Sequence, residues 1–199
     1  MGIHQRSSVS RALDAWIASG AQPALATVVH STSSAPRGIG AQLAIAPSGT
    51  SWTGGLSGGC AEVEVLDAAR AVLAADGPEA LLLTMTRDDL GAVGPVCGAT
   101  LTVIVERVSP ELAALYAESA AAAGSGASTT LTRTWRAGST DGTWRTLHAG
   151  TSDLERHGEP APDAVAFDVS AETYTAKFTW APPPRLIIGG SGDVAVELV

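Results

Sequence analysis

The chain contains two cysteines, and both lie in short segments dense in glycine. One segment, Gly54–Glu62, reads GGLSGGCAE and contains Cys60, and the other, Gly94–Gly98, reads GPVCG and contains Cys97. Glycine lets a ligand or another backbone come close where a side chain would block it. The pattern therefore favours a fold whose elements are joined by ligand-binding loops, with a thiol in each loop that meets a bulky, anionic or metallic group.

Composition excludes several classes of partner. Of 199 residues, 45% are hydrophobic and 16% charged, which is typical of a globular chain rather than a disordered one. The formal net charge of −8 argues against nucleic acid and anionic membranes as partners. No apolar run approaches the roughly 18 residues of a membrane span, and Met1–Arg11 lacks the apolar core of a signal peptide. We expect a cytoplasmic protein, in which cysteines serve as thiols, metal ligands or redox groups rather than as a disulfide.

Apolar spacing and turn signals predict a mixed α/β fold: a sheet with covering helices and glycine-rich ligand loops, followed by an antiparallel segment. Helical spacing covers residues 10–19, 61–75 and 109–123, and Ser109-Pro110-Glu111 is a typical helix start. Asp141-Gly142 predicts a hairpin. Strands are predicted over residues 24–29, 42–46, 51–53, 80–86, 100–106, 129–136, 143–148, 165–169 and 174–180.

The C-terminal residues predict the opening of a second domain. After the stiff spacer Pro182–Pro184, a buried-strand pattern leads into residues 190–195, GSGDVA, which match the turn of a dinucleotide-binding fold. Gly190 and Gly192 are the turn glycines, and the rest of a Rossmann-like domain is missing. The predicted domains are 1–181, with a subdivision near 107–128 as an alternative, and 182–199 as a linker and first strand. We do not expect NAD(P) binding by this chain alone.

The loop before the second predicted helix is a candidate anion or thiolate site. If Ala61 begins that helix, Cys60 lies at or beside its cap, where unpaired amides and the helix dipole favour negative charge. The N–H groups of Gly58 and Gly59 would be open to a ligand, and Ser57 adds a hydroxyl. Glu62 would raise the pKa of the thiol if its carboxylate pointed inward. The alternative interpretation is a tight turn around a small buried thiol.

Arg37 and Cys97 are the other candidates. Arg37 lies between a proline and a glycine, and its guanidinium offers a planar fork of donors suited to phosphate; a surface ion pair is the alternative. If the two cysteine loops fall at one end of a parallel sheet, the thiols converge there; a lone buried cysteine in a turn is the alternative for Cys97. The histidines show no metal-ligand spacing; they are His4, His30, His148 and His157.

Together these segments resemble the XdhC/CoxI family, maturation factors for molybdenum hydroxylases such as xanthine dehydrogenase. The resemblance is carried, in order, by SAPRG at residues 34–38, GGLSGGCAE at residues 54–62 and GPVCG at residues 94–98. The tail over residues 183–193 is similar to the family's entry into its Rossmann-like half, although Gly189-Gly190-Ser191 stands where an alanine between glycines is more usual.

The resemblance implies a chaperone that binds molybdenum cofactor (molybdopterin) transiently, assists its sulfuration and inserts it into an apo-enzyme, without turnover of its own. It also implies a homodimer, with a molybdenum hydroxylase and a cysteine desulfurase as partners. The implied molybdenum ligand is Cys60, since soft thiolates suit such a metal. The implied cofactor-binding residues are Arg37, Ser57, Gly58, Gly59, Cys60, Glu62 and Cys97.

Two other functions fit parts of the same sequence. A dithiol oxidoreductase would use Cys60 and Cys97 as its redox pair. A fragment of an NAD(P)-dependent oxidoreductase would account for the glycine-rich turn at residues 190–195.

Overall fold

The computed structural model describes residues 3–32, 37–59, 61–86, 100–141, 144–157, 164–170 and 172–182. Within these ranges the helices are α1 (Ile3–Ala18), α2 (Glu62–Leu73) and α3 (Pro110–Gly124). The strands are β1 (Ala24–Ser31), β2 (Gln42–Ile45), β3 (Trp52–Gly54), β4 (Ala80–Met85), β5 (Leu101–Arg107), β6 (Ser128–Asp141), β7 (Trp144–His157), β8 (Ala164–Ser170) and β9 (Thr173–Trp180).

The described strands form one sheet in the order β3-β2-β1-β5-β4-β7-β6-β9-β8. Every pairing along it is antiparallel. The predicted mixed α/β class is confirmed, whereas the parallel sheet considered for the cysteine loops is not what forms. Because β4 pairs with β7, the strands that precede residues 107–128 and the strands that follow them belong to one sheet. The predictions for residues 183–199, including the Rossmann-like turn at Gly190 and Gly192, lie outside the described residues.

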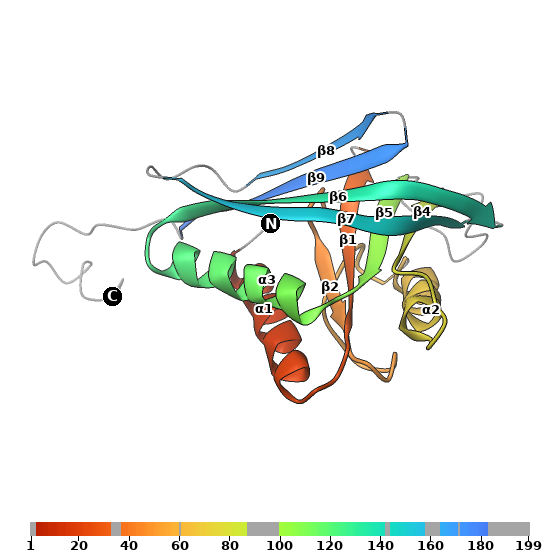
Figure 1. Cartoon of the computed structure of the whole chain (residues 1–199), viewed down its shortest axis with the longest axis horizontal. Helices are drawn as coiled ribbons and strands as arrows, with labels where there is room; N and C mark the ends of the chain where they lie inside the picture. The colour runs from red at the N-terminus through yellow and green to blue at the C-terminus, as the bar shows by residue number, and fades with distance from the viewer. Residues whose placement is uncertain are drawn as a thin grey trace, which may run out of the picture.

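Helices lie on both faces of the sheet (Figure 1): α2 packs against β1, β4 and β5 on one face, and on the other α1 packs against β2 and β3 while α3 packs against β6 and β9. Alternate residues of a strand point to opposite faces, so Leu25 of β1 packs with α1 and α3 in one core, whereas Ala26 packs in the other. That second core contains the buried face of α2, including Val65 and Val72. Two apolar cores therefore share the strands between them.

The ends of α3 form as its sequence predicts. Ser109 is the N-cap, and its hydroxyl accepts a hydrogen bond of 3.2 Å from the amide of Leu112. Pro110 follows at the first helical position, where its missing N–H has no helical partner to lose. By contrast, α1 begins at Ile3, well before the predicted residue 10. The prediction began too late because the first turns of the helix lack the apolar spacing on which it rested.

The β6–β7 hairpin is confirmed, and its strands are longer than predicted. Each strand has 14 residues, and much of β7 is exposed. Those exposed stretches contain threonine, serine, glycine and charged residues, which carry no apolar alternation to mark them as strand. None of the helices in the described ranges is long and apolar enough to cross a lipid bilayer.

Candidate functional site

The sheet register brings three chain segments to one end of the sheet. Ser31 at the end of β1 pairs with Leu101 at the start of β5, which in turn pairs with Met85 at the end of β4. The segment that leads to Arg37 follows β1, and the segment that contains Cys97 joins β4 to β5. The Gly54–Glu62 loop leaves β3, whose partner β2 follows the Arg37 segment. The strand ends that flank these segments thus lie at one end of an antiparallel sheet, and whether the two thiols converge there stays a prediction.

The glycine-rich loop begins against the backbone of β2. Gly54 has a φ of +106°, and an added Cβ there would lie 2.2 Å from the carbonyl oxygen of Gln42, so only glycine fits. The amide of Gly55 donates to that same carbonyl at 2.9 Å. The side chain of Gln42 is itself buried and donates to the hydroxyl of Tyr116 in α3. Leu56 is fully buried in the α2-side core. The loop therefore leaves the sheet from a fixed point.

The carboxylate of Glu62, the first residue of α2, turns back and gathers the loop around itself. Its Oε1 accepts hydrogen bonds from the amides of Leu56 and Ser57, both at 3.1 Å. Its Oε2 accepts from the Ser57 hydroxyl at 2.5 Å, the Gly59 amide at 2.9 Å and the Ala61 amide at 3.2 Å. Ala61, the N-cap of α2, has no side chain able to cap the helix, and the amides that donate to Glu62 all belong to residues that precede the helix.

These hydrogen bonds decide the charge of Glu62. Burial acts to raise the pKa of the carboxyl, but donation from the Ser57 hydroxyl and from the amides of Ser57 and Leu56 outweighs it. The pKa falls from an ordinary 4.5 to about 2, so the group is ionised throughout the physiological range. The loop thus closes around a permanent negative charge.

Two sequence-based expectations for this loop need correction. The Gly59 amide, expected to be open to a ligand, already donates to Glu62. The Ser57 hydroxyl, expected to face a ligand, is buried, donates to Glu62 and accepts from the Ala61 amide at 2.9 Å. The open feature of the loop is instead its backbone surface at Gly58 and Gly59, where φ is +92° and +123° and an added Cβ would meet nothing within 4 Å.

Arg37 lies against this loop. An added Cβ on Gly55 would come within 3.4 Å of the guanidinium carbon of Arg37, so the guanidinium passes close over the backbone there. The residue is exposed to solvent. A cation thus stands beside the glycine-rich loop, where it can meet an anionic ligand.

The remaining predicted site residues, Cys60 and Cys97, lie outside the described residues. Among the residues that are described, no group of three or more histidine, cysteine, aspartate or glutamate side chains is arranged to hold a metal ion.

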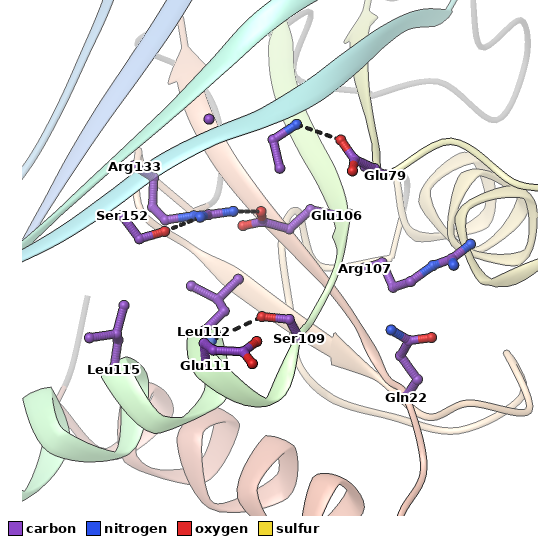
Figure 2. A pocket seen from close by; sticks show the side chains of 12 residues that line it. Gln22, Glu79, Glu106, Arg107, Ser109, Glu111, Leu112, Leu115, Arg133 and Ser152 are labelled. Carbon is purple, nitrogen blue, oxygen red and sulfur yellow. Dashed lines mark hydrogen bonds and ion pairs between the residues drawn. The ribbon is translucent and has the colours of Figure 1, made fainter.

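A cavity of about 500 Å³, which the sequence did not predict, lies elsewhere in the molecule, between the start of α3 and strands β5, β6 and β7 (Figure 2). On its wall, buried Glu106 and Arg133 form an ion pair, and Arg133 also donates to Ser152. Glu106 further accepts from the indole N–H of Trp135 at 3.2 Å. A glutamate at the end of an otherwise apolar strand was the available sequence signal.

Most charged groups around this cavity have internal partners, although the buried Nε of Arg133 has no hydrogen-bond partner among the described residues. Glu79 accepts from the amide of Ala149 at 2.8 Å. Arg107 turns toward α2 (Figure 2) and donates to the carbonyls of Val72 and Ala74 at its C-terminal end. These contacts tie β5 to its neighbours, which is a structural role. The glycine-rich end of the sheet is therefore the stronger candidate site.

Comparison with known proteins agrees with this choice. The family model described as XdhC and CoxI family matches residues 16–85, a stretch that includes Arg37 and the whole Gly54–Glu62 loop. The match shows that this stretch is similar to the XdhC and CoxI family. Cys97 and the C-terminal turn lie beyond the stretch that the XdhC/CoxI model matches.

A solved structure described as a xanthine dehydrogenase from Bacillus halodurans has a similar fold. It aligns with a TM-score of 0.56 and 19% sequence identity, over 87% of this chain and 53% of that one. The chain therefore spans about half the length of that protein, and at this identity the likeness shows the fold alone. A comparison with curated proteins finds no match.

Proposed function

We propose that this protein is a molybdenum cofactor-binding chaperone that assists sulfuration of the cofactor and its insertion into a xanthine dehydrogenase-type molybdenum hydroxylase. The observation that carries the proposal is the convergence, at one sheet end, of Arg37, the glycine-rich loop and the strand ends that flank the Cys97 segment. The similarity of residues 16–85 to the XdhC and CoxI family supports the same role, and a cytoplasmic location is part of this proposal.

The described residues offer a surface for the pterin and a cation for the phosphate of such a cofactor, but no free amide cradle for the phosphate. A flat pterin needs an open surface, which the bare backbone at Gly58 and Gly59 offers. A phosphate needs a cation, which Arg37 supplies beside Gly55. The loop amides bound to Glu62 do not fit a phosphate, because a carboxylate already fills them. In this proposal Cys60 ligates molybdenum and Cys97 is a second thiol near the exchanging sulfur.

Delivery to an apo-enzyme requires a surface for a protein partner. Two of the exposed large apolar side chains lie on segments of the candidate site: Ile39 is 41% exposed, two residues after Arg37, and Val63 is 61% exposed, directly after Glu62. Exposed apolar side chains beside a ligand site are typical of interaction surfaces. We propose the molybdenum hydroxylase as the partner there, with a cysteine desulfurase as sulfur donor and a homodimer as the working form.

The test is cofactor uptake. The protein is produced together with the cofactor biosynthesis proteins, purified without oxygen, and analysed for molybdenum and for pterin fluorescence. We expect close to one cofactor per chain. Cys60→Ser and Arg37→Gln lower the affinity, the latter by roughly tenfold or more because a charged hydrogen bond is lost.

The control variant is Arg136→Gln, which removes an exposed arginine on β6, away from the glycine-rich loop. It should bind as the wild type does. Absence of cofactor in the wild-type protein would remove the proposed function, and normal binding by Cys60→Ser would remove Cys60 from the site.

A further inference from the structure

The cavity beside the start of α3 has a buried floor and a charged rim (Figure 2). The floor is the ion pair of Glu106 and Arg133, whose side chains are 5% and 6% exposed. The rim includes two exposed glutamates, Glu79 just before β4 and Glu111 in the first turn of α3. A volume of about 500 Å³ is many times the ~30 Å³ share of one water molecule and is typical of ligand pockets. The space is therefore large enough for a small organic molecule.

Arg133 leaves one donor of the floor unused. Its two terminal nitrogens donate to Glu106 and to Ser152. Its Nε–H is buried and has no acceptor in the part of the chain that the structure describes. An unpaired buried donor costs about 1–3 kcal/mol, so such a group ordinarily indicates an acceptor that water or a ligand supplies. The floor therefore favours an occupant that carries an oxygen acceptor.

The carboxylates of the cavity each use one oxygen and leave the other. Arg133 and the indole of Trp135 both donate to Oε2 of Glu106. The Ala149 amide donates to Oε2 of Glu79 at 2.8 Å. Within the described ranges, no donor reaches Oε1 of either carboxylate. Since each carboxylate oxygen has two lone pairs, both Oε1 atoms can accept N–H donors from a ligand.

The charge of the described lining is negative on balance. Three carboxylates and two guanidinium groups line the cavity. Arg133 is neutralised by Glu106, and Arg107 turns away to the C-terminal end of α2 (Figure 2). The excess of negative charge is therefore at Glu79 and Glu111, on the rim. A cation is attracted to such a rim, and an anion is repelled.

The start of α3 does not reverse this preference. A helix N-terminus ordinarily attracts an external anion. Here the Ser109 hydroxyl accepts from the amide of Leu112 at 3.2 Å, and the carboxylate of Glu111 supplies the anion. Hydrogen bonds from its own amide and from the Ser109 hydroxyl lower the pKa of Glu111 below its usual range. A phosphate that approached this end of the helix would meet an ionised carboxylate.

We infer that this cavity binds a small organic cation: a protonated amine that also carries a neutral oxygen and a short apolar body, as an amino alcohol does. The ammonium group is held by the rim carboxylates of Glu79 and Glu111, and the oxygen accepts from the Nε–H of Arg133. The apolar body lies against Leu112 and Leu115, which also line the cavity. This site is separate from the glycine-rich loop and does not depend on the molybdenum cofactor.

The first experiment is an NMR titration of the full chain with phenylalaninol, an amino alcohol with a phenyl body. The reporters are the indole N–H of Trp135, assigned with Trp135→Phe, and the Nε–H of Arg133. The guanidinium of Arg133 lies 5.2 Å from the centroid of the Trp135 ring, so its Nε–H is assigned through contacts with the indole. We expect saturable shifts of both signals, with a Kd of about 1 mM or below. No saturable shift at up to about 20 mM would overturn the inference and leave a cavity that holds only water.

Two analogues and inorganic phosphate test the class of ligand. Phenylalanine has the same skeleton with a carboxylate in place of the hydroxymethyl group, and 3-phenylpropan-1-ol lacks the ammonium group. Each should bind at least about tenfold more weakly than phenylalaninol, because one adds a repelled charge and the other loses the charged hydrogen bonds. Phosphate should leave both reporter signals unshifted. Equal binding of either analogue, or saturable shifts with phosphate, would overturn the assignment to an organic cation.

Substitution of the rim glutamates tests where the ammonium group is held. Glu79→Gln and Glu111→Gln should each raise the Kd of phenylalaninol about threefold, and the double variant about tenfold, since exposed charges contribute modestly. Both side chains are exposed, so these variants keep the fold. The control is Glu64→Gln, in α2 on the opposite face of the sheet from α3, and it should leave the Kd unchanged.

An unchanged Kd in the double variant would overturn the role of the rim. Because none of these measurements involves the cofactor, a failure of the proposed function is judged separately.

Discussion

At the scale of single residues, hydrogen bonds to Glu62 lower the pKa of its carboxyl group by more than burial raises it. A partly buried carboxyl group would ordinarily have a raised pKa, but the donors of the loop lower the pKa of Glu62 to about 2. Since the unfolded chain has the ordinary value of 4.5, the ionised form is the one that the fold stabilises.

A pH dependence of stability follows. The contribution of Glu62 is fully present above pH 4.5 and is lost as the pH falls toward 2, because protonation then removes the acceptor. Glu62→Gln should lower the free energy of unfolding by about 2 kcal/mol at pH 7, allowing for partial solvent screening. Urea unfolding at pH 7, 4 and 2.5 checks this: the gap between the two proteins should narrow steadily. A gap that stays constant with pH would contradict the assigned pKa.

Gly54 carries a second prediction at this scale. Gly54→Ala introduces a Cβ 2.2 Å from the carbonyl of Gln42 at a φ of +106°, and should cost at least about 3 kcal/mol in the free energy of unfolding. Gly124→Ala, at the end of α3 where an added Cβ meets nothing within 4 Å, is the control and should change it by less than about 1 kcal/mol. Similar unfolding midpoints for the two variants would count against the described turn.

The sequence predicted a glycine-rich loop before a helix at residues 54–62, but it did not predict the hydrogen-bond partners within that loop. Glycines and a helix start at residues 54–62 predicted an anion-favouring loop, and the anion that the described residues show there is the carboxylate of Glu62. The direction of the Glu62 side chain depends on the positive φ values at Gly58 and Gly59, which fold the loop back over the helix. That curvature is not encoded in residue spacing, so the amide of Gly59 was wrongly expected to be open.

At the scale of elements, a buried ion pair joins two strands that are not neighbours in the sheet. Glu106 is the penultimate residue of β5, and Arg133 lies in β6, three places further along the sheet with β4 and β7 between them. The guanidinium of Arg133 also lies 5.2 Å from the ring centroid of Trp135, whose indole donates to Glu106. Buried pairs of this kind cost much desolvation and tolerate poorly the loss of one partner.

Removal of both partners should therefore cost less stability than the two single removals added together. Arg133→Met or Glu106→Leu alone should lower the free energy of unfolding by about 3–5 kcal/mol, since each leaves an uncompensated buried charge. The double variant should lose clearly less than the sum of the two. A double-mutant cycle from urea unfolding measures the coupling, and strictly additive losses would contradict the ion pair.

Most elements were predictable from sequence because their apolar spacing is regular. Residues 24–29, 80–86 and 100–106 read as buried strands, and all three became strands with boundaries shifted by a few residues at most. The outer parts of β6 and β7 were missed because both faces there are polar. The antiparallel order of the sheet was also not predictable, since spacing along one strand carries no information about its neighbour.

At the scale of the whole molecule, the two apolar cores share one sheet. Leu13 of α1 and Val65 of α2 are both fully buried, yet they lie in different cores on opposite faces of the same strands. Loss of either core would expose the other through β1 and β5. The described fold should therefore unfold as one unit.

Matched substitutions check this cooperativity. Leu13→Ala should lower the free energy of unfolding by about 2–4 kcal/mol and Val65→Ala by about 2 kcal/mol. In each variant, far-ultraviolet circular dichroism and tryptophan fluorescence should give coincident transitions. Val63→Ala, on the exposed side of α2 at 61% exposure, is the control and should change stability by no more than about 0.5 kcal/mol. Separate transitions for the two probes would divide the molecule into independent units.

The antiparallel sheet has a consequence for how ligand preference is altered. The segment after β1, the loop after β3 and the connection between β4 and β5 are each held at their own strand ends. Each one can be lengthened, shortened or exchanged while the pairing that supports the others stays intact. In such a sheet, the residues at the ligand-binding end can be changed one segment at a time, by design or by natural mutation, while the strand pairing is kept.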